Sequence, residues 1–224
     1  MAIVLDLFAL PRAAKSRTRK LRDAFFASYL DANPGAQRIE VDLAKDADKL
    51  PAWDEWDVQT KFEMLYGEGN LDEEMATRWN ALARWTDQLH QANLIVVSTP
   101  MWNFSIPWQL KRWIDAVVQA RLTFDYDRKK GEFKGLLTGR PVVLLVTRDG
   151  AYPPGSPYAA MDFQVPYLKT VFGLIGLGPF HEIIAEPMAM GGPQVAKDAL
   201  ASAIQNATDL GRTLEVVDPG DTVA

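Results

Sequence analysis

The chain has 224 residues, 48% of them hydrophobic, which is enough for one globular domain, residues 1–224, with a substantial buried core. Its 24 basic and 29 acidic residues give a net charge of −5 and argue against nucleic acid or an anionic membrane surface as the main partner. The absence of cysteine excludes disulfides, thiolate nucleophiles and cysteine-based metal sites, and it fits a reducing compartment.

The first ten residues, MAIVLDLFAL, predict a strand at 3–9 rather than a signal peptide, because no basic region precedes the apolar run. Apolar residues at helical spacing follow at 17–30, and an alternating pattern predicts a second strand at 37–43. Residues 44–70 are acidic, show no clean period and are interpreted as a partly helical excursion over the rim of a sheet. No apolar run reaches membrane-spanning length, so we expect a cytoplasmic protein without a membrane partner.

The centre of the chain predicts a strand-loop-helix unit. A helix at 71–93 leads into an apolar, β-branched run at 94–97, which is typical of a strand buried on both faces. After a loop, Ser105 is the expected N-cap of the next helix, with Pro107 in its first turn. The loop thus lies at the carboxyl end of the strand, the edge at which open parallel sheets bind ligands.

The remainder of the chain continues the alternation. The expected elements are a charged hairpin-like insertion at 127–134, a buried strand at 141–147, a helix at 158–175 interrupted by Pro166, a strand at 180–185, a last helix from 193 to about 214 and a frayed tail at 218–224. This pattern predicts the α/β class, a three-layer α/β/α sandwich around a parallel five-stranded sheet. In the strand order 2-1-3-4-5, the loops after the first, third and fourth strands lie side by side.

The loop after the first strand contains neither a G-x-G-x-x-G fingerprint nor a G-x-x-x-x-G-K-[ST] loop. Instead, residues 12–22 carry six basic residues and no acid, with hydroxyls at Ser16 and Thr18. One interpretation is a phosphate held at the start of a helix by N–H groups, hydroxyls and a guanidinium. The other is a solvated basic helix face with Ser16 as an ordinary cap. This loop alone favours neither.

The other two loops have features expected of a site for a flat ligand. The tetrapeptide M-W-N-F at 101–104 follows the third strand, and T-R-D-G at 147–150 follows the fourth. The glycine allows close backbone approach to a planar ligand, and Thr147 offers a hydroxyl. Side by side, the three loops would hold a phosphate, the edge of a ring system and the polar rim of that ring system.

Several stretches resemble the FMN-dependent NADH azoreductases, also described as NADH:quinone reductases of the flavodoxin-like superfamily. They are S-R-T at 16–18, P-M-W-N-F-S-I at 100–106, L-K-R-W-I-D at 110–115, L-T-F-D-Y at 122–126, T-R-D-G at 147–150 and V-P-Y-L at 165–168. The resemblance covers nearly the whole chain, and the M-[YW]-N-F loop is its most specific part. It implies a flavodoxin-like fold and an enzyme with FMN as cofactor and NADH or NADPH as co-substrate.

The resemblance also implies roles for individual residues. Ser16, Arg17 and Thr18 would hold the FMN phosphate; Met101, Trp102, Asn103 and Phe104 would line the isoalloxazine; Thr147, Arg148, Asp149 and Gly150 would contact its polar edge; and Phe124, Tyr126 and Arg121 would bind the substrate. Hydride would pass from NAD(P)H to flavin N5 and then, in a ping-pong sequence, to a small aromatic acceptor such as a quinone, azo or nitro compound. No catalytic side chain is required, and neither His90 nor His181 has the neighbours of a metal ligand.

Four positions depart from the family pattern. Leu10 replaces a serine near the phosphate, Trp102 a tyrosine, Asp149 a glycine and Arg121 a glycine beside the flavin pocket. Two alternatives therefore stand beside the enzyme. One is a flavodoxin-like carrier of single electrons to protein partners, which would be expected to have a hydroxyl- and glycine-rich phosphate loop rather than a basic one. The other is a family member that has lost flavin chemistry.

Large apolar side chains near the third strand predict a homodimer. Trp108 and Trp113 lie roughly 140° apart on a helix of about 3.6 residues per turn, so one buried stripe cannot easily hold both. With Phe124 and Tyr126, they leave more apolar surface than a monomer should expose. A two-fold partner would cover it. The resemblance implies shared active sites as well, because family members complete the pocket with residues of the second chain.

Overall fold

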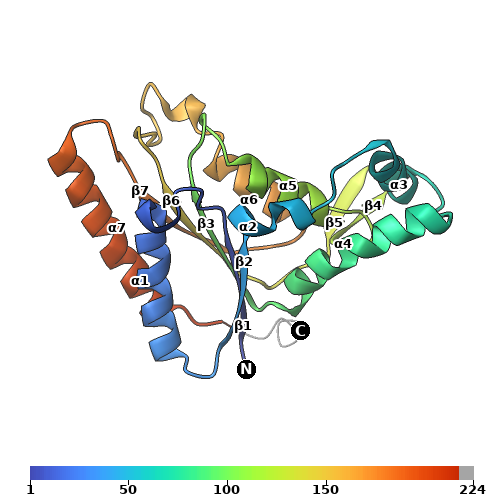
Figure 1. Ribbon diagram of the computed structural model, residues 1–224, viewed down its shortest axis with the longest axis horizontal. Helices are drawn as coiled ribbons and strands as arrows, with labels where there is room; N and C mark the ends of the chain where they lie inside the picture. The colour runs from blue at the N-terminus through green and yellow to red at the C-terminus, as the bar shows by residue number, and fades with distance from the viewer. Residues whose placement is uncertain (217–224) are drawn as a thin grey trace.

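Five parallel strands form the central sheet, in the order β2-β1-β3-β6-β7 (Figure 1). Their bounds are Ile3–Phe8 for β1, Gln37–Asp42 for β2, Leu94–Pro100 for β3, Val142–Thr147 for β6 and Phe180–Ala185 for β7. This computed structural model describes residues 1–216, so the tail predicted at 218–224 lies outside it. If the five strands of this sheet are numbered 1 to 5 in chain order, so that β6 is the fourth and β7 the fifth, the order is 2-1-3-4-5. This confirms the predicted α/β topology.

Helices cover both faces of the sheet (Figure 1). One layer contains α1 (Arg17–Ala32) and α7 (Pro193–Thr213), and the other contains α2 (Leu43–Asp46), α4 (Glu73–Gln91), α5 (Trp108–Val117) and α6 (Val165–Leu174). Successive side chains of β3 point to opposite faces of the sheet, and both sets are buried. Leu94 and Val96 belong to the core under α1 and α7, and Ile95 and Val97 belong to the core under the other layer. A strand buried on both faces is an unbroken apolar run. Among residues 1–216, no helix is long and apolar enough to cross a membrane.

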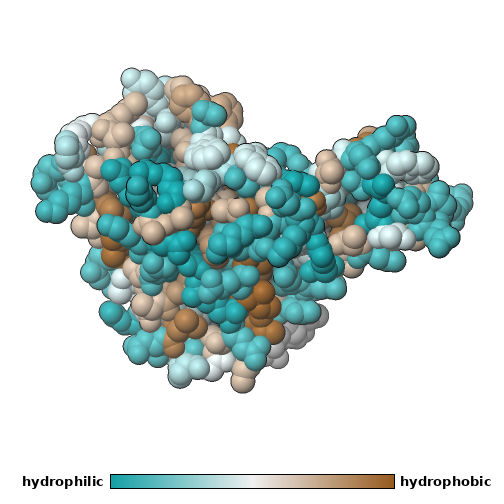
Figure 2. Space-filling view, viewed as in Figure 1, coloured by the Kyte–Doolittle hydropathy of each residue, from teal (hydrophilic) through white to brown (hydrophobic). Residues whose placement is uncertain are grey.

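An arm extends beyond the sheet on the side of α4 (Figures 1 and 2). It consists of α3 (Glu55–Tyr66), which packs against α4, and the antiparallel hairpin of β4 (Phe124–Asp127) and β5 (Glu132–Gly135). The 44–70 segment is therefore partly helical, because it contains α2, a 3-10 turn at Ala47–Lys49 and α3. The hairpin contains the 127–134 insertion and begins earlier, at Phe124.

The predicted N-cap at Ser105 is wrong. Helix α5 begins at Trp108 after Pro107, and no side chain caps it. Ser105 instead closes a turn with Trp102: each backbone N–H donates to the other's carbonyl, at 2.8 and 2.9 Å. The Ser105 hydroxyl donates to the Phe163 carbonyl at 3.3 Å, so a contact with a distant segment takes the group that the cap would have used.

The predicted interruption of a helix by Pro166 is also wrong. Residues 158–175 are divided into a 3-10 turn at Ala159–Met161 and α6, which starts at Val165. Pro166 lies in the first turn of α6, where its missing N–H costs no helical hydrogen bond. The proline therefore marks the start of the helix rather than a break in it.

A buried ion pair fastens α1 to the sheet. Asp6 of β1 is 0% exposed and Arg22 of α1 is 4% exposed, and Arg22 donates to both carboxylate oxygens, with Nε 2.9 Å from Oδ1. Arg38 of β2 donates to the same carboxylate at 2.7 Å, and Arg22 also donates to Glu40 at 2.9 Å. Burial raises the pKa of Asp6, and both guanidinium groups oppose that shift. The buried charges are thus compensated only while these partners stay together.

Replacing Asp6 by alanine is expected to lower the free energy of unfolding by about 3–5 kcal/mol, because it leaves the buried Arg22 guanidinium without its main partner. Urea denaturation followed by circular dichroism measures the change. Glu74→Ala is the control: it removes an exposed ion pair with Arg78 on α4 and is expected to leave the unfolding midpoint nearly unchanged. Equal midpoints for both variants would contradict the role given to Asp6.

Candidate functional site

The loops after β1, β3 and β6 meet at the carboxyl edge of the sheet and enclose a cavity of about 150 Å³. Residues from all three predicted loops line it: Ser16, Arg17, Thr18, Met101, Trp102, Thr147 and Asp149, together with Pro11, Arg12, Pro100 and Met188. The other predicted cofactor residues, Asn103, Phe104, Arg148 and Gly150, belong to the same loops but do not line this cavity. The structure therefore brings the three segments to one place.

The first loop turns β1 into α1. A 3-10 turn at Ala13–Lys15 precedes Ser16, which is buried and is the N-cap of α1. Its hydroxyl accepts from Arg19 N at 3.4 Å, a long and therefore weak bond, and the same side chain lines the cavity. The first N–H groups of a helix point out of its start and attract anions. Capping and anion binding, the two interpretations of this loop, are thus compatible.

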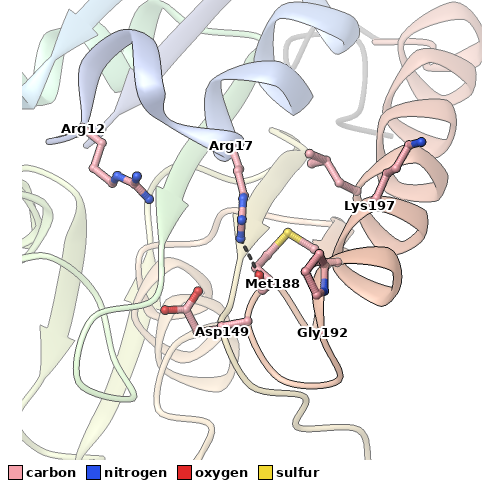
Figure 3. A pocket seen from close by; sticks show the side chains of 10 residues that line it. Arg12, Arg17, Asp149, Met188, Gly192 and Lys197 are labelled. Atoms are coloured by element: carbon pink, nitrogen blue, oxygen red, sulfur yellow. Dashed lines mark hydrogen bonds between the residues drawn. The ribbon is translucent and has the colours of Figure 1, made fainter.

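The basic residues of 12–22 do not form one surface. Arg22 lies in the ion pair described above, and Arg19 donates to a backbone carbonyl within the loop at 3.2 Å. Arg17 reaches across the cavity and donates to the Met188 carbonyl (Figure 3). Of the basic residues in this stretch, Arg12 and Arg17 line the cavity, so two guanidinium groups provide its positive charge.

The second loop is a tight turn with two residues in the left-handed region. Asn103 has a φ of 46° and Phe104 a φ of 67°. Asparagine tolerates this conformation better than a bulky side chain, so Phe104 depends on outside support. Phe163 N donates to the Phe104 carbonyl at 2.9 Å, and the Tyr152 ring meets the Phe104 ring edge-on at 6.3 Å. The turn is thereby fixed, with the rings of Trp102 and Phe104 partly exposed.

Thr147 connects the third loop to the other two. Its hydroxyl shares a buried hydrogen bond of 2.7 Å with the Thr18 hydroxyl of α1, and its carbonyl accepts from Met101 N at 2.9 Å. Each hydroxyl carries one hydrogen and the pair uses one of them, so one remains to be donated to a ligand. The site is therefore held together by direct bonds between its loops.

Arg148 points away from the cavity. Its side chain is 2% exposed, and its guanidinium lies 2.9 Å from the Asp162 carboxylate and 3.3 Å from that of Glu186. Asp162 precedes α6 and Glu186 follows β7, so Arg148 fastens the third loop to both elements. Glu186 also accepts from Tyr152 N at 3.2 Å. Because the guanidinium is paired with these two carboxylates, the predicted contact between Arg148 and the polar edge of the isoalloxazine would have to be made by the Arg148 backbone.

Phe124, Tyr126 and Arg121 lie in the arm. Phe124 is buried beside Phe133, and the Tyr126 ring stacks on Phe133 at 4.7 Å. Arg121 has a φ of 65° and donates to two backbone carbonyls just after α3. Tyr126 and Arg121 border a separate cavity of about 360 Å³. Within one chain, the predicted substrate residues and the predicted cofactor residues are therefore apart.

A larger cavity of about 700 Å³ lies beside the second loop and against α5. Trp53, Trp102, Trp108 and Tyr167 provide its aromatic walls. Burial and the nearby Asp115 carboxylate raise the pKa of Tyr167 to about 12. Flat aromatic molecules suit such walls because rings stack or meet edge-on.

Sequence reasoning gave no role to Tyr152, Tyr167 or Met188. A signal existed for Met188, which follows β7 at the same carboxyl edge as the other loops. For Tyr152 the sequence offers only an adjacent glycine: a Cβ at Gly150 would lie 2.8 Å from the Tyr152 hydroxyl, so the glycine lets this ring lie across the loop. Within residues 1–216, no three His, Asp or Glu side chains are grouped to hold a metal ion.

Comparison with known proteins gives consistent matches along the chain. A family model described as the flavodoxin-like fold matches residues 3–210. The FMN-dependent NADH:quinone oxidoreductase of Nitratidesulfovibrio vulgaris is 38% identical over 208 residues, covering 92% of this chain and 97% of the relative. The enzyme of the same name from Nostoc sp. is 35% identical, covering 92% and 100%. The crystal structure of an azoreductase from Bacillus anthracis superposes with a TM-score of 0.84 at 28% identity, covering 96% of this chain and all of that one.

Proposed function

The chain belongs to the family with the flavodoxin-like fold, and on that premise we propose that it is an FMN-dependent NADH:quinone oxidoreductase that also reduces azo compounds. The convergence of the three loops on one cavity carries the proposal. This chain covers 97% and 100% of the length of two relatives named for this activity. The azoreductase of similar structure supports the second class of acceptor.

The groups around the cavity fit a phosphate monoester. Ser16, Arg17 and Thr18 would hold the phosphate through two hydroxyls, a guanidinium and the N–H groups at the start of α1. Arg12 adds a second positive charge, and Asp149 is the one carboxylate that lines this cavity. Leu10 offers no hydroxyl, so these groups and the backbone must supply the hydrogen bonds.

The two remaining loops would hold the ring of the cofactor. Met101, Trp102, Asn103 and Phe104 would line the isoalloxazine, and the backbone of 147–150 with the Thr147 hydroxyl would meet its polar edge. When bound, FMN would supply two-electron chemistry at N5, taking hydride from NADH or NADPH and passing it, in a ping-pong sequence, to a quinone, azo or nitro compound. The chain itself would bind, orient and shield the flat ligands, using Trp102, Phe104 and Tyr152.

The position of the arm favours a homodimer with shared active sites. Phe124, Tyr126 and Arg121 do not border the cofactor cavity of their own chain, so they could contact the substrate there only from a second chain. On α5, Trp113 is 0% exposed and Trp108 is 54% exposed, in agreement with the expectation that one stripe cannot bury both. Trp108 borders the 700 Å³ aromatic cavity, so a partner seated on α5 would cover it beside the second loop.

The first expectation is that purified protein binds one FMN per chain and oxidises NADH or NADPH with a quinone. Calorimetric titration of flavin-free protein measures the binding, and absorbance of the reduced nicotinamide measures turnover. Binding of FMN without turnover would favour the electron-carrier alternative. The absence of both would contradict the proposed function.

The second expectation concerns Asn103. Asn103→Gly keeps the left-handed turn and removes the side chain, whereas Asn103→Ala removes the side chain and strains the turn. If the amide bonds to the ring edge, both variants should weaken FMN binding by about 1–3 kcal/mol, the cost of a lost hydrogen bond to a buried group. Calorimetry measures the affinities, with equal unfolding midpoints as the control for fold. Wild-type affinity in Asn103→Gly would show that the residue serves the turn alone.

The third expectation is that the working unit has twice the chain mass of 25.0 kDa. Sedimentation equilibrium should return this mass, and Trp108→Glu should both dissociate the dimer and lower quinone turnover, because it places a charge in the covered surface. Val195→Glu is the matched control, since Val195 is exposed on α7 in the opposite layer. Full turnover by a 25.0 kDa species would rule out shared sites.

A further inference from the structure

Two arginines from another part of the chain hold the end of α3 in the arm (Figure 1). Arg121 donates from Nη1 to the Glu68 carbonyl at 3.2 Å and from Nη2 to the Gly67 carbonyl at 3.1 Å. Arg128, in the turn of the β4–β5 hairpin, donates from Nη2 to the Leu65 and Gly67 carbonyls at 3.3 and 2.9 Å. The last carbonyls of a helix lack partners within the helix and carry partial negative charge, so cations are favoured there. We refer to Arg121 and Arg128 as the arginine clamp.

The backbone on both sides of the clamp is adapted to it. Arg121 has a φ of 65°, a conformation that is uncommon for a residue other than glycine. A Cβ at Gly69 would overlap Arg121 Nη1, so the guanidinium lies against this loop because residue 69 is glycine. The Glu63 carboxylate accepts from Gly69 N at 3.0 Å and from Asn70 N at 3.2 Å. The loop after α3 is thus bonded through its N–H groups as well as its carbonyls.

Helix α3 has little other support. Its buried residues are Thr60 and Met64, and most helical stability in proteins comes from packing of a buried face. Its start is joined to α4 by Arg78, which lies 2.8 Å from the Asp54 carboxylate and 3.1 Å from that of Asp57. The place of its other end relative to the hairpin therefore depends on the clamp.

The elements that the clamp joins also share a row of aromatic rings. The rings of Phe62 and Tyr66 on α3 lie 5.6 Å apart, Tyr66 meets Tyr126 of β4 edge-on at 6.5 Å, and Tyr126 stacks on Phe133 of β5 at 4.7 Å. Phe62, Tyr66 and Phe133 are each more than half exposed. A shift of α3 would separate Tyr66 from Tyr126 and divide this aromatic row.

We propose that Arg121 and Arg128 are positioning residues for the acceptor: by fixing α3 against the hairpin they maintain the aromatic row, and the row favours acceptors with two separate aryl rings over single-ring quinones. The inference rests on the proposed function and its shared sites, in which the arm of one chain faces the acceptor bound by the other. The Arg121 guanidinium is bonded to the loop after α3, so Arg121 acts through that helix rather than by contact with the acceptor.

The size of the acceptor gives the physical reason for this selectivity. A single-ring quinone can lie wholly on the flavin, whereas an azo compound with an aryl group on each nitrogen extends beyond it. The second aryl group can then stack on the rings of the arm, which face outward. Loss of the clamp should therefore weaken binding of the long acceptor and spare the short one.

Steady-state kinetics of Arg128→Ala with a diaryl azo compound and with benzoquinone test the inference. The KM for the azo compound is expected to rise by about fivefold, the equivalent of about one net hydrogen bond, while its kcat and the KM for benzoquinone change by less than about twofold. Hydrogen exchange of the α3 amides should become faster, because the helix end is released. Arg128→Lys keeps a charged donor and should bring the azo KM back to within about twofold of the wild type.

Lys130→Ala is the matched control, since it removes one positive charge from the same hairpin turn at a residue outside the clamp. It should change neither KM nor the exchange of α3. Arg121→Gly is the second variant: glycine suits the φ of 65°, so the guanidinium is removed without new backbone strain, and the ratio of the azo KM to the benzoquinone KM should again rise.

The other outcomes overturn the inference. Unchanged exchange of α3 in Arg128→Ala would show that the clamp does not hold the helix. Faster exchange with both KM values unchanged would show that the aromatic row does not meet the acceptor, and an equal rise of both KM values would show that it does not select between them. In these cases the proposed function would stand. Failure of the wild-type protein to reduce either acceptor would remove the proposed function together with the inference.

Discussion

The ion pair between Asp6 and Arg22 determines where the first loop of the site lies. Asp6 is two residues before the end of β1, about 7 Å along the strand. Arg22 is six residues after the N-cap Ser16, about 9 Å along α1. Fixing Arg22 over Asp6 therefore brings the start of α1 back to the carboxyl end of β1. The position of the loop proposed to bind the phosphate thus follows from a charge pair that does not itself line the cavity.

The other loops are then joined to this start of α1 by a few direct bonds. The hydroxyl pair between Thr18 and Thr147 connects α1 to β6, and the bond from Met101 N to the Thr147 carbonyl connects β3 to β6. Arg148 fastens the same segment from behind through Asp162 and Glu186. Because these bonds lie between loops, the cavity has its shape before any ligand arrives, which lowers the entropy cost of binding.

The sequence predicted the sheet well because its signals are local. The strand at 180–185 has the predicted bounds, and the apolar runs at 94–97 and 141–147 lie within or close to the bounds of β3 and β6. The meeting of the three loops was also predicted, since parallel strands end at one edge, and the cofactor site that they would form stays a prediction. The roles of side chains were harder to predict. Ser105 bonds to Phe163 and Arg148 to Glu186, partners that lie 58 and 38 residues away, and no local pattern reports such contacts.

The arm exposes several large aromatic side chains, and contacts within one chain do not account for them. Its α3 and β5 expose Trp56, Phe62, Tyr66 and Phe133, although a small hairpin gains little stability from rings left in water. The ordered aromatic contacts inside the arm, such as Tyr126 on Phe133, still leave an aromatic surface facing outward. Such a surface is stabilised when it packs against another. The proposed homodimer would supply such a partner, because the exposed Trp108 of α5 and the arm of each chain would make two equivalent contacts under one two-fold axis.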